Sequence, residues 1–254
     1  MADPKTPHVA LMVTCLVDTM RPTVGFASVK LLEDAGCRVS VPAQTCCGQP
    51  NWNSGDKKGA AELARTMIAA LECHDYVVVP SGSCAATVIK DYPAILADDP
   101  DWAGRAQDLA DRTHEIVSFL TDVMGISGVT ARLEAEATYH DSCSGLRSLG
   151  IKEQPRALLA SVEGLSVTEM AEPEVCCGFG GTFCVKYPDI SNKMVTNKTD
   201  DILATDADLL LAGDLGCLMN MGGKLSRRGK PVKARHVVEV LAGMTETPAI
   251  GEEG

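Results

Sequence analysis

The feature that most constrains this chain is a Cys-Cys-Gly triplet that occurs twice, at residues 46–48 and again at residues 176–178. A single cysteine lies 31 or 33 residues before each triplet, and another lies 37 or 40 residues after each cysteine pair. These outer cysteines are Cys15 and Cys84 in the first half and Cys143 and Cys217 in the second. A four-thiol pattern repeated in register indicates a soft metal centre, held twice or built in two parts.

The redox state of the cysteines decides whether they serve as disulfides or as ligands. The chain has 11 cysteines, an odd number that cannot be fully paired. Its N-terminus is polar and lacks the apolar segment of a secretory signal, so we expect a cytoplasmic protein with reduced cysteines. No apolar run approaches the roughly 18 residues of a membrane helix, so we expect no direct membrane insertion, only association through a partner.

The charge of the chain bears on its partners. The net charge is −11, and no run of Lys or Arg interrupts the acidic background. Because nucleic acid and anionic lipid surfaces attract basic proteins, we expect no nucleic-acid partner and favour protein partners instead.

Apolar runs of strand length alternate with helical patterns in both halves, which predicts βαβ units with parallel strands. The fold class that we predict is α/β, with two tandem pseudo-symmetric repeats, each a small parallel sheet with flanking helices. The predicted strands are 8–15, 37–42, 75–80, 137–141, 165–170 and 208–213. The predicted helices are 22–35, 56–71, 113–124, 154–162 and 190–205, with further helices after Cys84 and Cys217.

The expected domain boundary falls in residues 125–131. We assign residues 1–125 to the first cysteine-rich repeat and residues 126–254 to the second, with an acidic tail at 247–254 that we expect to be disordered. The cysteines follow the C-terminal ends of predicted strands, where open α/β sheets bind their ligands. Each set of four cysteines should therefore converge on one site.

Four converging thiolates suit an iron–sulfur cubane, and Gly48 and Gly178 allow the backbone to approach a bulky inorganic core. Zinc also accepts four thiolates, but its structural sites favour Cys-x-x-Cys hairpins, which neither half contains; zinc stays open as the less favoured alternative. We predict one or two [4Fe–4S] clusters. The predicted ligands are Cys15, Cys46, Cys47 and Cys84, and Cys143, Cys176, Cys177 and Cys217.

The other three cysteines, Cys37, Cys73 and Cys184, do not recur in both halves, and we predict that they are not ligands. His140 and Asp141 precede Cys143, so either could hydrogen-bond a cluster or serve a structural role. Three basic residues close to the cysteines could offset the negative charge of a cluster, namely Arg21, Arg147 and Lys186.

Six stretches together resemble a known family: 13–20, 45–50, 80–84, 140–143, 176–183 and 216–220. They are similar to the cysteine-rich domain of heterodisulfide reductase and of the glycolate oxidase iron–sulfur subunit, and more closely to the lactate-utilisation protein A family. The resemblance implies an iron–sulfur electron-transfer subunit of a multi-subunit, non-NAD lactate dehydrogenase complex that oxidises lactate to pyruvate. It also implies partner subunits that contain flavin or further Fe–S centres, and no catalytic residue in this chain.

One departure from the family bears on the cluster type. The full family pattern ends each repeat in Cys-x-x-Cys, whereas this chain has Ser81 and Asp214 at the first of those two positions. Four cysteines per repeat suit an ordinary cubane rather than the five-thiolate, disulfide-cleaving cluster. Two other functions stay open: a heterodisulfide-reductase-like subunit acting on a thiol or disulfide, and a non-enzymatic Fe–S redox-sensing module.

Overall fold

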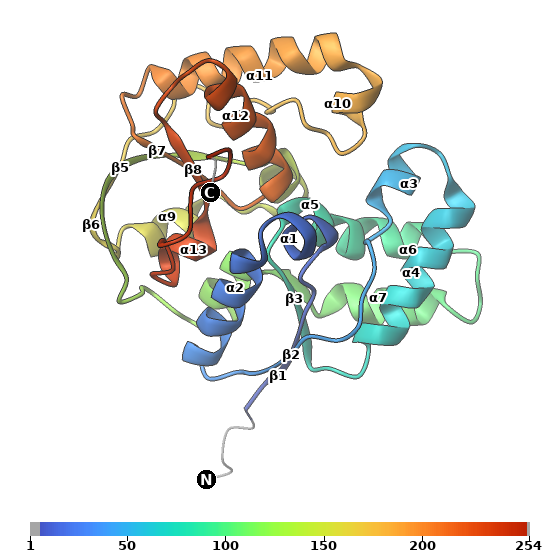
Figure 1. Cartoon of the computed structure of the whole chain (residues 1–254). Coiled ribbons are helices and arrows are strands. Elements are labelled where there is room, and N and C mark those ends of the chain that lie inside the picture. The colour runs from blue at the N-terminus through green and yellow to red at the C-terminus, as the bar shows by residue number, and fades with distance from the viewer. Residues whose placement is uncertain (1–5, 253–254) are drawn as a thin grey trace. The chain divides into compact units, whose positions relative to one another are not determined.

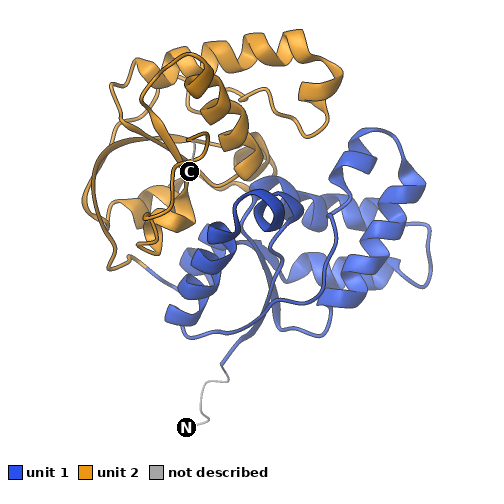
Figure 2. Ribbon diagram, in the orientation of Figure 1, with its two compact units in different colours: residues 1–126 blue, residues 127–254 orange. Residues whose placement is uncertain are grey.

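The computed structural model describes residues 6–252. The chain divides into two compact units, Met1–Ile126 (unit 1) and Ser127–Gly254 (unit 2), which Figure 2 shows in different colours. Each unit contains one four-stranded sheet in which every strand pair is parallel. The predicted α/β fold of two repeats, each with a small parallel sheet and flanking helices, is confirmed.

Unit 1 has the strand order β2-β1-β3-β4. Its strands are β1 (His8–Leu11), β2 (Arg38–Ser40), β3 (Tyr76–Val79) and β4 (Thr113–Glu115). Its α-helices are α1 (Cys15–Met20), α2 (Pro22–Asp34), α3 (Gln49–Asn53), α4 (Lys57–Leu71), α5 (Gly82–Ala86), α6 (Tyr92–Ile95), α7 (Ala103–Asp111) and α8 (Ile116–Ser118). Two single π-helical turns, η1 (Thr87–Asp91) and η2 (Phe119–Val123), extend α5 and α8. Helix α2 covers one face of this sheet, and α4 and α7 cover the other (Figure 1).

Unit 2 has the equivalent order β6-β5-β7-β8. Its strands are β5 (Arg132–His140), β6 (Glu163–Val167), β7 (Leu209–Ala212) and β8 (Lys233–His236). Its helices are α9 (Glu153–Leu159), α10 (Phe183–Lys186), α11 (Pro188–Leu203), α12 (Leu215–Arg227) and α13 (Val237–Leu241), with a π-helical turn η3 (Ser144–Ser148). Because helices cover both faces of each sheet, the central strands β3 and β7 are apolar and buried almost throughout.

The registers of the two sheets match residue for residue. Val9 pairs with Tyr76 in unit 1, and Ala137 pairs with Leu209 in unit 2. Counted from these pairs, Cys15 is equivalent to Cys143 and Cys84 to Cys217. The repeat seen in the sequence is therefore also a repeat of the backbone.

Two sequence predictions were wrong. The predicted helix at 113–124 begins with strand β4, because residues 113–115 pair with β3 and only the later residues are helical. The C-terminal tail is ordered as far as the structure describes it. Ala249 is buried, and the Ile250 amide donates a hydrogen bond to the Ala234 carbonyl of β8. Residues 253–254 of the predicted tail lie outside the described residues.

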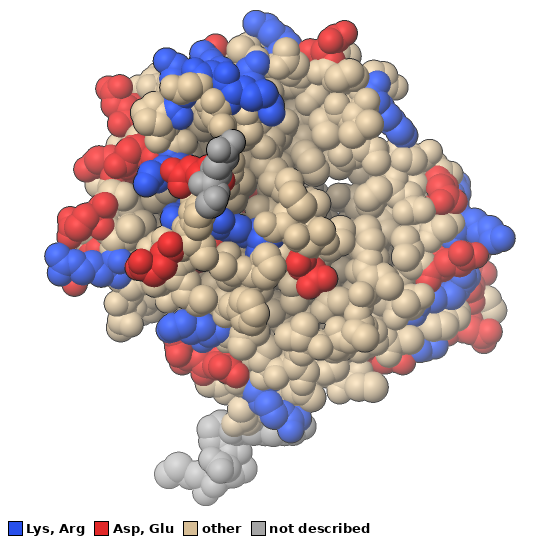
Figure 3. Space-filling view, viewed as in Figure 1, with Lys and Arg blue, Asp and Glu red and all other residues tan. Residues whose placement is uncertain are grey.

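Charged side chains of both signs are interspersed over the face shown in Figure 3, so the net negative charge is not gathered in one area of it. One group of basic side chains lies over the end of α12, whose last turn carries Lys224 and Arg227. Cations there complement the negative end of the helix dipole. Among the described residues, no helix is both long and apolar enough to cross a bilayer.

Candidate metal centre

The four predicted ligands of unit 1 come from three consecutive strand ends. Cys15 opens α1 after β1, Cys46 and Cys47 lie in the loop after β2, and Cys84 lies in the first turn of α5 after β3. The C-terminal ends of parallel strands share one edge of the sheet, so these loops meet there. The Sγ atoms of Cys47 and Cys84 are 3.5 Å apart, and the Cys46 thiol is hydrogen-bonded by both Cys15 and Cys47. The four thiols therefore form one continuous group.

The thiols of unit 2 are connected in the same order. Cys143 follows β5, Cys176 and Cys177 lie in the loop after β6, and Cys217 lies in the first turn of α12 after β7. Hydrogen bonds link Cys143 to Cys176, Cys176 to Cys177 and Cys177 to Cys217. The structure thus brings together each set of four cysteines that the sequence grouped; that they bind metal stays a prediction.

Each group has one cysteine that favours its thiolate form. The pKa values of Cys46 and Cys176 lie well below the usual thiol range, first because two neighbouring thiols donate hydrogen bonds to each of them. The backbone amide of the following glycine also donates; the Gly178 nitrogen is 3.4 Å from the Cys176 Sγ. The pKa values of Cys15 and Cys143 are raised, mainly because they are the donors and then because each thiol is partly shielded from water. Metal binding would have to displace these protons, as for thiolate sites in general.

Glycine is required after each cysteine pair. Gly48 and Gly178 have φ values of +84° and +85°, in the left-handed region that disfavours side chains. A Cβ on Gly48 would lie 3.3 Å from Leu63 Cβ of α4, and one on Gly178 would lie 2.9 Å from the Ser191 carbonyl of α11. The tight turn against the helix fixes the direction of both cysteine side chains.

The two positions that depart from the family pattern start the helices that carry the last cysteines. The Ser81 hydroxyl accepts a hydrogen bond from the Cys84 amide, and an Asp214 carboxylate oxygen accepts one from the Gly216 amide. Both residues are buried N-caps, which stabilise the first turn of a helix. The oxygen atoms at these positions therefore have a structural role.

The carbonyl of the second cysteine in each pair is held by a different side chain in each unit. The buried Tyr92 hydroxyl donates to the Cys47 carbonyl at 2.9 Å, and the Asn220 amide donates to the Cys177 carbonyl at 2.9 Å. No role was predicted for either residue from the sequence. Because the two residues differ in type and in position along the chain, the repeat pattern carried no signal for them.

The three remaining cysteines make other contacts. Cys37 is buried with its Sγ 3.9 Å from the Met124 Sδ, Cys73 is exposed, and the Cys184 thiol lies 3.5 Å from the Gly181 carbonyl. That none of the three is a ligand stays a prediction.

Of the three basic residues suggested as charge partners, Arg147 instead donates to the Glu174 carbonyl. A cation whose charge acts on Cys177 and Cys217 is Lys198 of α11, which was not predicted from the sequence. Its side chain is 1% exposed, and its ammonium donates to the Glu172 carbonyl.

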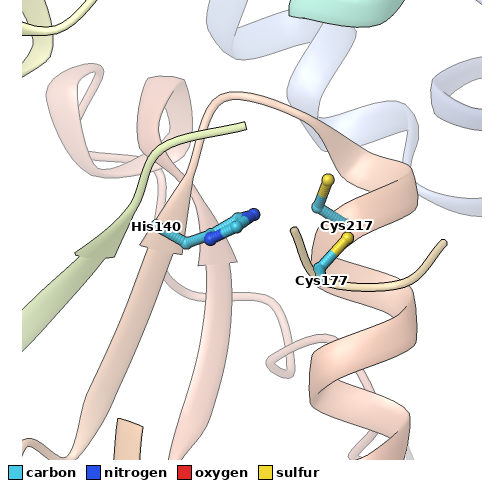
Figure 4. Close-up of side chains that lie close together, drawn as sticks. All are labelled: His140, Cys177 and Cys217. Carbon is cyan, nitrogen blue, oxygen red and sulfur yellow. The ribbon is translucent and has the colours of Figure 1, made fainter. Parts of the chain in front are cut away.

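Asp141 and His140 have different environments although they are adjacent. The buried Asp141 carboxylate is paired with both terminal nitrogens of Arg156, at 3.0 and 2.8 Å, so its role is structural. One ring nitrogen of His140 lies within 4.8 Å of the Sγ atoms of Cys177 and Cys217, and all three residues are buried. Figure 4 shows the ring directed from β5 toward these two cysteines.

The fold and the thiol groups define a class of protein, in which each of two α/β repeats gathers four cysteines at the edge of a parallel sheet. A family model described as the cysteine-rich domain matches residues 9–89 and 137–222, once in each unit. Lactate utilization protein A of Bacillus cytotoxicus is 49% identical over 92% of this chain and 98% of its own length. Lactate utilization protein A 2 of Bacillus mycoides is 50% identical, and Lactate utilization protein A of Anoxybacillus flavithermus is 49% identical, both with the same coverage. The chain belongs to the lactate utilization protein A family of cysteine-rich domain proteins.

A solved structure shares the fold. A hypothetical protein from Helicobacter pylori aligns with a TM-score of 0.65 at 12% identity, over 96% of this chain and 51% of that one. This chain therefore spans about half the length of that protein, and the likeness concerns the fold alone.

Proposed function

We propose that this chain is an iron–sulfur electron-transfer subunit of a multi-subunit complex that oxidises lactate to pyruvate. The observation that carries the proposal is the pair of four-thiol groups in a chain about half identical to proteins named for lactate utilisation. The chain would work in the cytoplasm, and any membrane association would come through a partner subunit.

Each thiol group fits one [4Fe–4S] cluster, with Cys15, Cys46, Cys47 and Cys84 as ligands in unit 1 and Cys143, Cys176, Cys177 and Cys217 in unit 2. Four thiolates are the number that a cubane takes, and the thiols reach the site from three separate strand ends. Such a cluster supplies storage for one electron at a time. The N-caps Ser81 and Asp214 support this cluster type rather than a five-thiolate one, because their oxygens bind helix amides.

The protein around each group does three things. Before any metal binds, it favours the thiolate form of one cysteine in each group through hydrogen bonds to Cys46 or Cys176. It shields the second cysteine of each pair from water, since Cys47 and Cys177 are 3% and 1% exposed. It leaves Cys15 exposed, so the thiol group of unit 1 has one side open to solvent or to a partner. An accessible edge beside a buried centre suits electron exchange between proteins.

Lactate oxidation removes two electrons, whereas each proposed centre takes one. We therefore assign the lactate-oxidising step to partner subunits with flavin, further Fe–S centres or both, and to this chain the onward transfer of electrons. Its enzymatic role is that of a subunit in an oxidoreductase.

Anaerobic purification of the full chain, with iron, acid-labile sulfide and zinc analysis, tests the metal assignment. We expect about eight iron and eight sulfide per chain if both groups are filled, and electron paramagnetic resonance signals of four-thiolate clusters after dithionite. Zinc without sulfide would contradict the iron–sulfur assignment. D- or L-lactate should reduce the clusters only in the copurified complex; reduction of the isolated chain by lactate would make this subunit the catalyst instead.

A further inference from the structure

We propose that His140 donates a hydrogen bond to the sulfur of the metal centre in unit 2 and makes this centre easier to reduce than its counterpart in unit 1. The inference rests on the proposed function, because it requires a metal–sulfur centre in each unit. It assigns a positioning and electronic role to a residue outside both ligand sets.

The first observation is the isolation of the imidazole. His140 is fully buried at the end of β5, and neither of its ring nitrogens makes a hydrogen bond of acceptable geometry with any residue that the structure describes. The Pro173 carbonyl lies close enough to act on the ring as an acceptor. A buried polar group without a partner is costly, and such groups in folded proteins normally mark a missing ligand, ion or water.

The second observation is the direction of the ring. One of its nitrogens lies within 4.8 Å of the Cys177 and Cys217 Sγ atoms, and Figure 4 shows the ring pointing at these cysteines. An imidazole carries at least one N–H whether it is neutral or protonated, so it can donate in either state. Four cysteines already complete a cubane, which leaves the histidine as a donor to sulfur rather than as a ligand to iron.

The third observation is that unit 1 has no such donor at the matching position. The register of the sheets makes Met12, three residues before Cys15, equivalent to His140, three residues before Cys143. Met12 is also fully buried, but a thioether carries no proton to donate.

A second pair of equivalent positions, on the helices that pack against the turn glycines, is also apolar in unit 1 and polar in unit 2. Gly48 packs on Ala60 and Leu63 of α4, and Gly178 packs on Ser191 and Met194 of α11. Leu63 therefore corresponds to Met194, and four residues further along each helix Met67 corresponds to Lys198. The Met67 sulfur accepts a hydrogen bond from the Thr45 amide, whereas the Lys198 side chain places a buried ammonium close enough to act on Cys177 and Cys217. Unit 2 thus has an N–H donor and an ammonium, the latter 3.9 Å from the Asp201 carboxylate, where unit 1 has two methionines.

These differences favour the reduced form in unit 2. Reduction adds one negative charge to the centre, and an N–H donor and an ammonium both stabilise that charge. Hydrogen bonds to the sulfurs and net charge are among the properties that set cluster potentials. At equilibrium, an electron shared between the two centres should therefore reside mainly in unit 2.

Potentiometric titration of the full chain, followed by electron paramagnetic resonance, tests the inference. The signal of unit 2 is identified as the one lost in Cys176→Ser/Cys177→Ser. In His140→Met we expect this signal to titrate at a more negative potential, with the iron and sulfide content unchanged. His140→Gln, which keeps an N–H donor, should restore part of the shift.

Matched variants separate this role from a merely structural one. Met12→His should shift the signal of unit 1 to a more positive potential. His74→Met serves as the control, because His74 contacts Leu71 and His8 rather than a thiol, and both midpoints should stay unchanged. If His140→Met does not fold, as judged by circular dichroism, the inference is tested by the midpoint potential of unit 1 in Met12→His alone.

Two results would overturn the inference: an unchanged midpoint in a folded His140→Met variant or in Met12→His, and loss of iron from folded His140→Met, which would make His140 a ligand. Wild-type protein without iron and sulfide would instead overturn the proposed function, so the two failures are distinguishable.

Discussion

Unit 1 and unit 2 present their thiols from equivalent loops, but the residues behind the thiols differ in polarity. Unit 1 has the apolar residues Met12 and Met67 at the positions that are equivalent to His140 and Lys198 of unit 2. The strand ends, the glycine turn and the helix N-cap are shared by both units. The comparison shows that one scaffold can keep the loops that carry its thiols while equivalent buried positions differ in charge and hydrogen-bonding capacity.

The largest expected effect comes from removing the cysteine pairs one unit at a time. Cys46→Ser/Cys47→Ser and Cys176→Ser/Cys177→Ser should each lower the iron content by about half, because a cubane needs all four thiolates. Iron and sulfide analysis of anaerobically purified protein measures this. Cys73→Ser, at an exposed cysteine outside both groups, is the control and should keep all iron. Loss of all iron from either double variant would show that the eight thiols hold one shared centre.

The next largest effect concerns the ion pair beside the thiols of unit 2. Arg156→Ala leaves the buried Asp141 carboxylate without its partner and should lower the free energy of unfolding by about 3 kcal/mol. Unit 1 has Val13 at the position of Asp141, and its Arg105–Glu72 pair lies on the surface, so Arg105→Ala should cost much less. Urea unfolding of the two variants measures the difference. Equal losses would show that burial of the pair in unit 2 has no energetic consequence.

A smaller difference is expected at the two turn glycines. Gly48→Ala should cost about 1–2 kcal/mol, because an L-residue is strained at this positive φ. Gly178→Ala should cost about 2 kcal/mol more, because its Cβ would lie 2.9 Å from a carbonyl oxygen of α11 and overpack the turn. Thermal unfolding of both apoproteins is the measurement. A larger loss of thermal stability in Gly48→Ala than in Gly178→Ala would mean that α11 of unit 2 moves aside for the added methyl group more easily than α4 of unit 1.

The smallest effect should not distinguish the units at all. The pKa of Glu72 in unit 1 is lowered by its hydrogen bond with Arg105, and the pKa of Glu174 in unit 2 is lowered by Lys152. A carboxyl group whose pKa is lower in the folded than in the unfolded state stabilises the fold at pH values above the unfolded pKa of about 4.3. This stabilisation is lost as the pH falls through the folded-state pKa. Glu72→Gln and Glu174→Gln should therefore each slightly destabilise the protein at pH 7, and the difference from wild type should shrink as the pH falls below about 4.3. A deficit of the same size in urea unfolding at pH 7 and at pH 3 would contradict this.

Those features that both halves repeat could be predicted from the sequence. Apolar runs that end at Cys15 or a few residues before Cys84, Cys143 and Cys217 indicated the strands, and parallel strands place their ends together. Strands β4 and β8 were not predicted, because sequences such as Lys-Ala-Arg-His at 233–236 are polar and become strands only by pairing with the buried β3 and β7. The polar tail was misjudged for a similar reason: its contacts, such as the hydrogen bond from Arg235 to the Thr247 carbonyl, are tertiary.

The site was predictable to the same extent. The thiols recur in register and so stood out, whereas Lys198, Tyr92 and Asn220 have no counterpart of the same type in the other half. Their importance depends on which helix turn faces the cysteine loop, and a single sequence does not contain that information. His140 was noted for its place before Cys143, but its burial and the direction of its ring toward Cys177 and Cys217 could be seen only in the structure.

The sheet of unit 1 also bears on how the protein is made. All four of its strands and all four of its thiols lie within residues 8–115, so nothing in this sheet waits for a segment of unit 2. During translation, domains generally fold as units from the N-terminus. The first thiol group can therefore be complete on the ribosome while the second half of the chain is still being translated. Under the proposed function, the two centres could then receive iron and sulfide at different times.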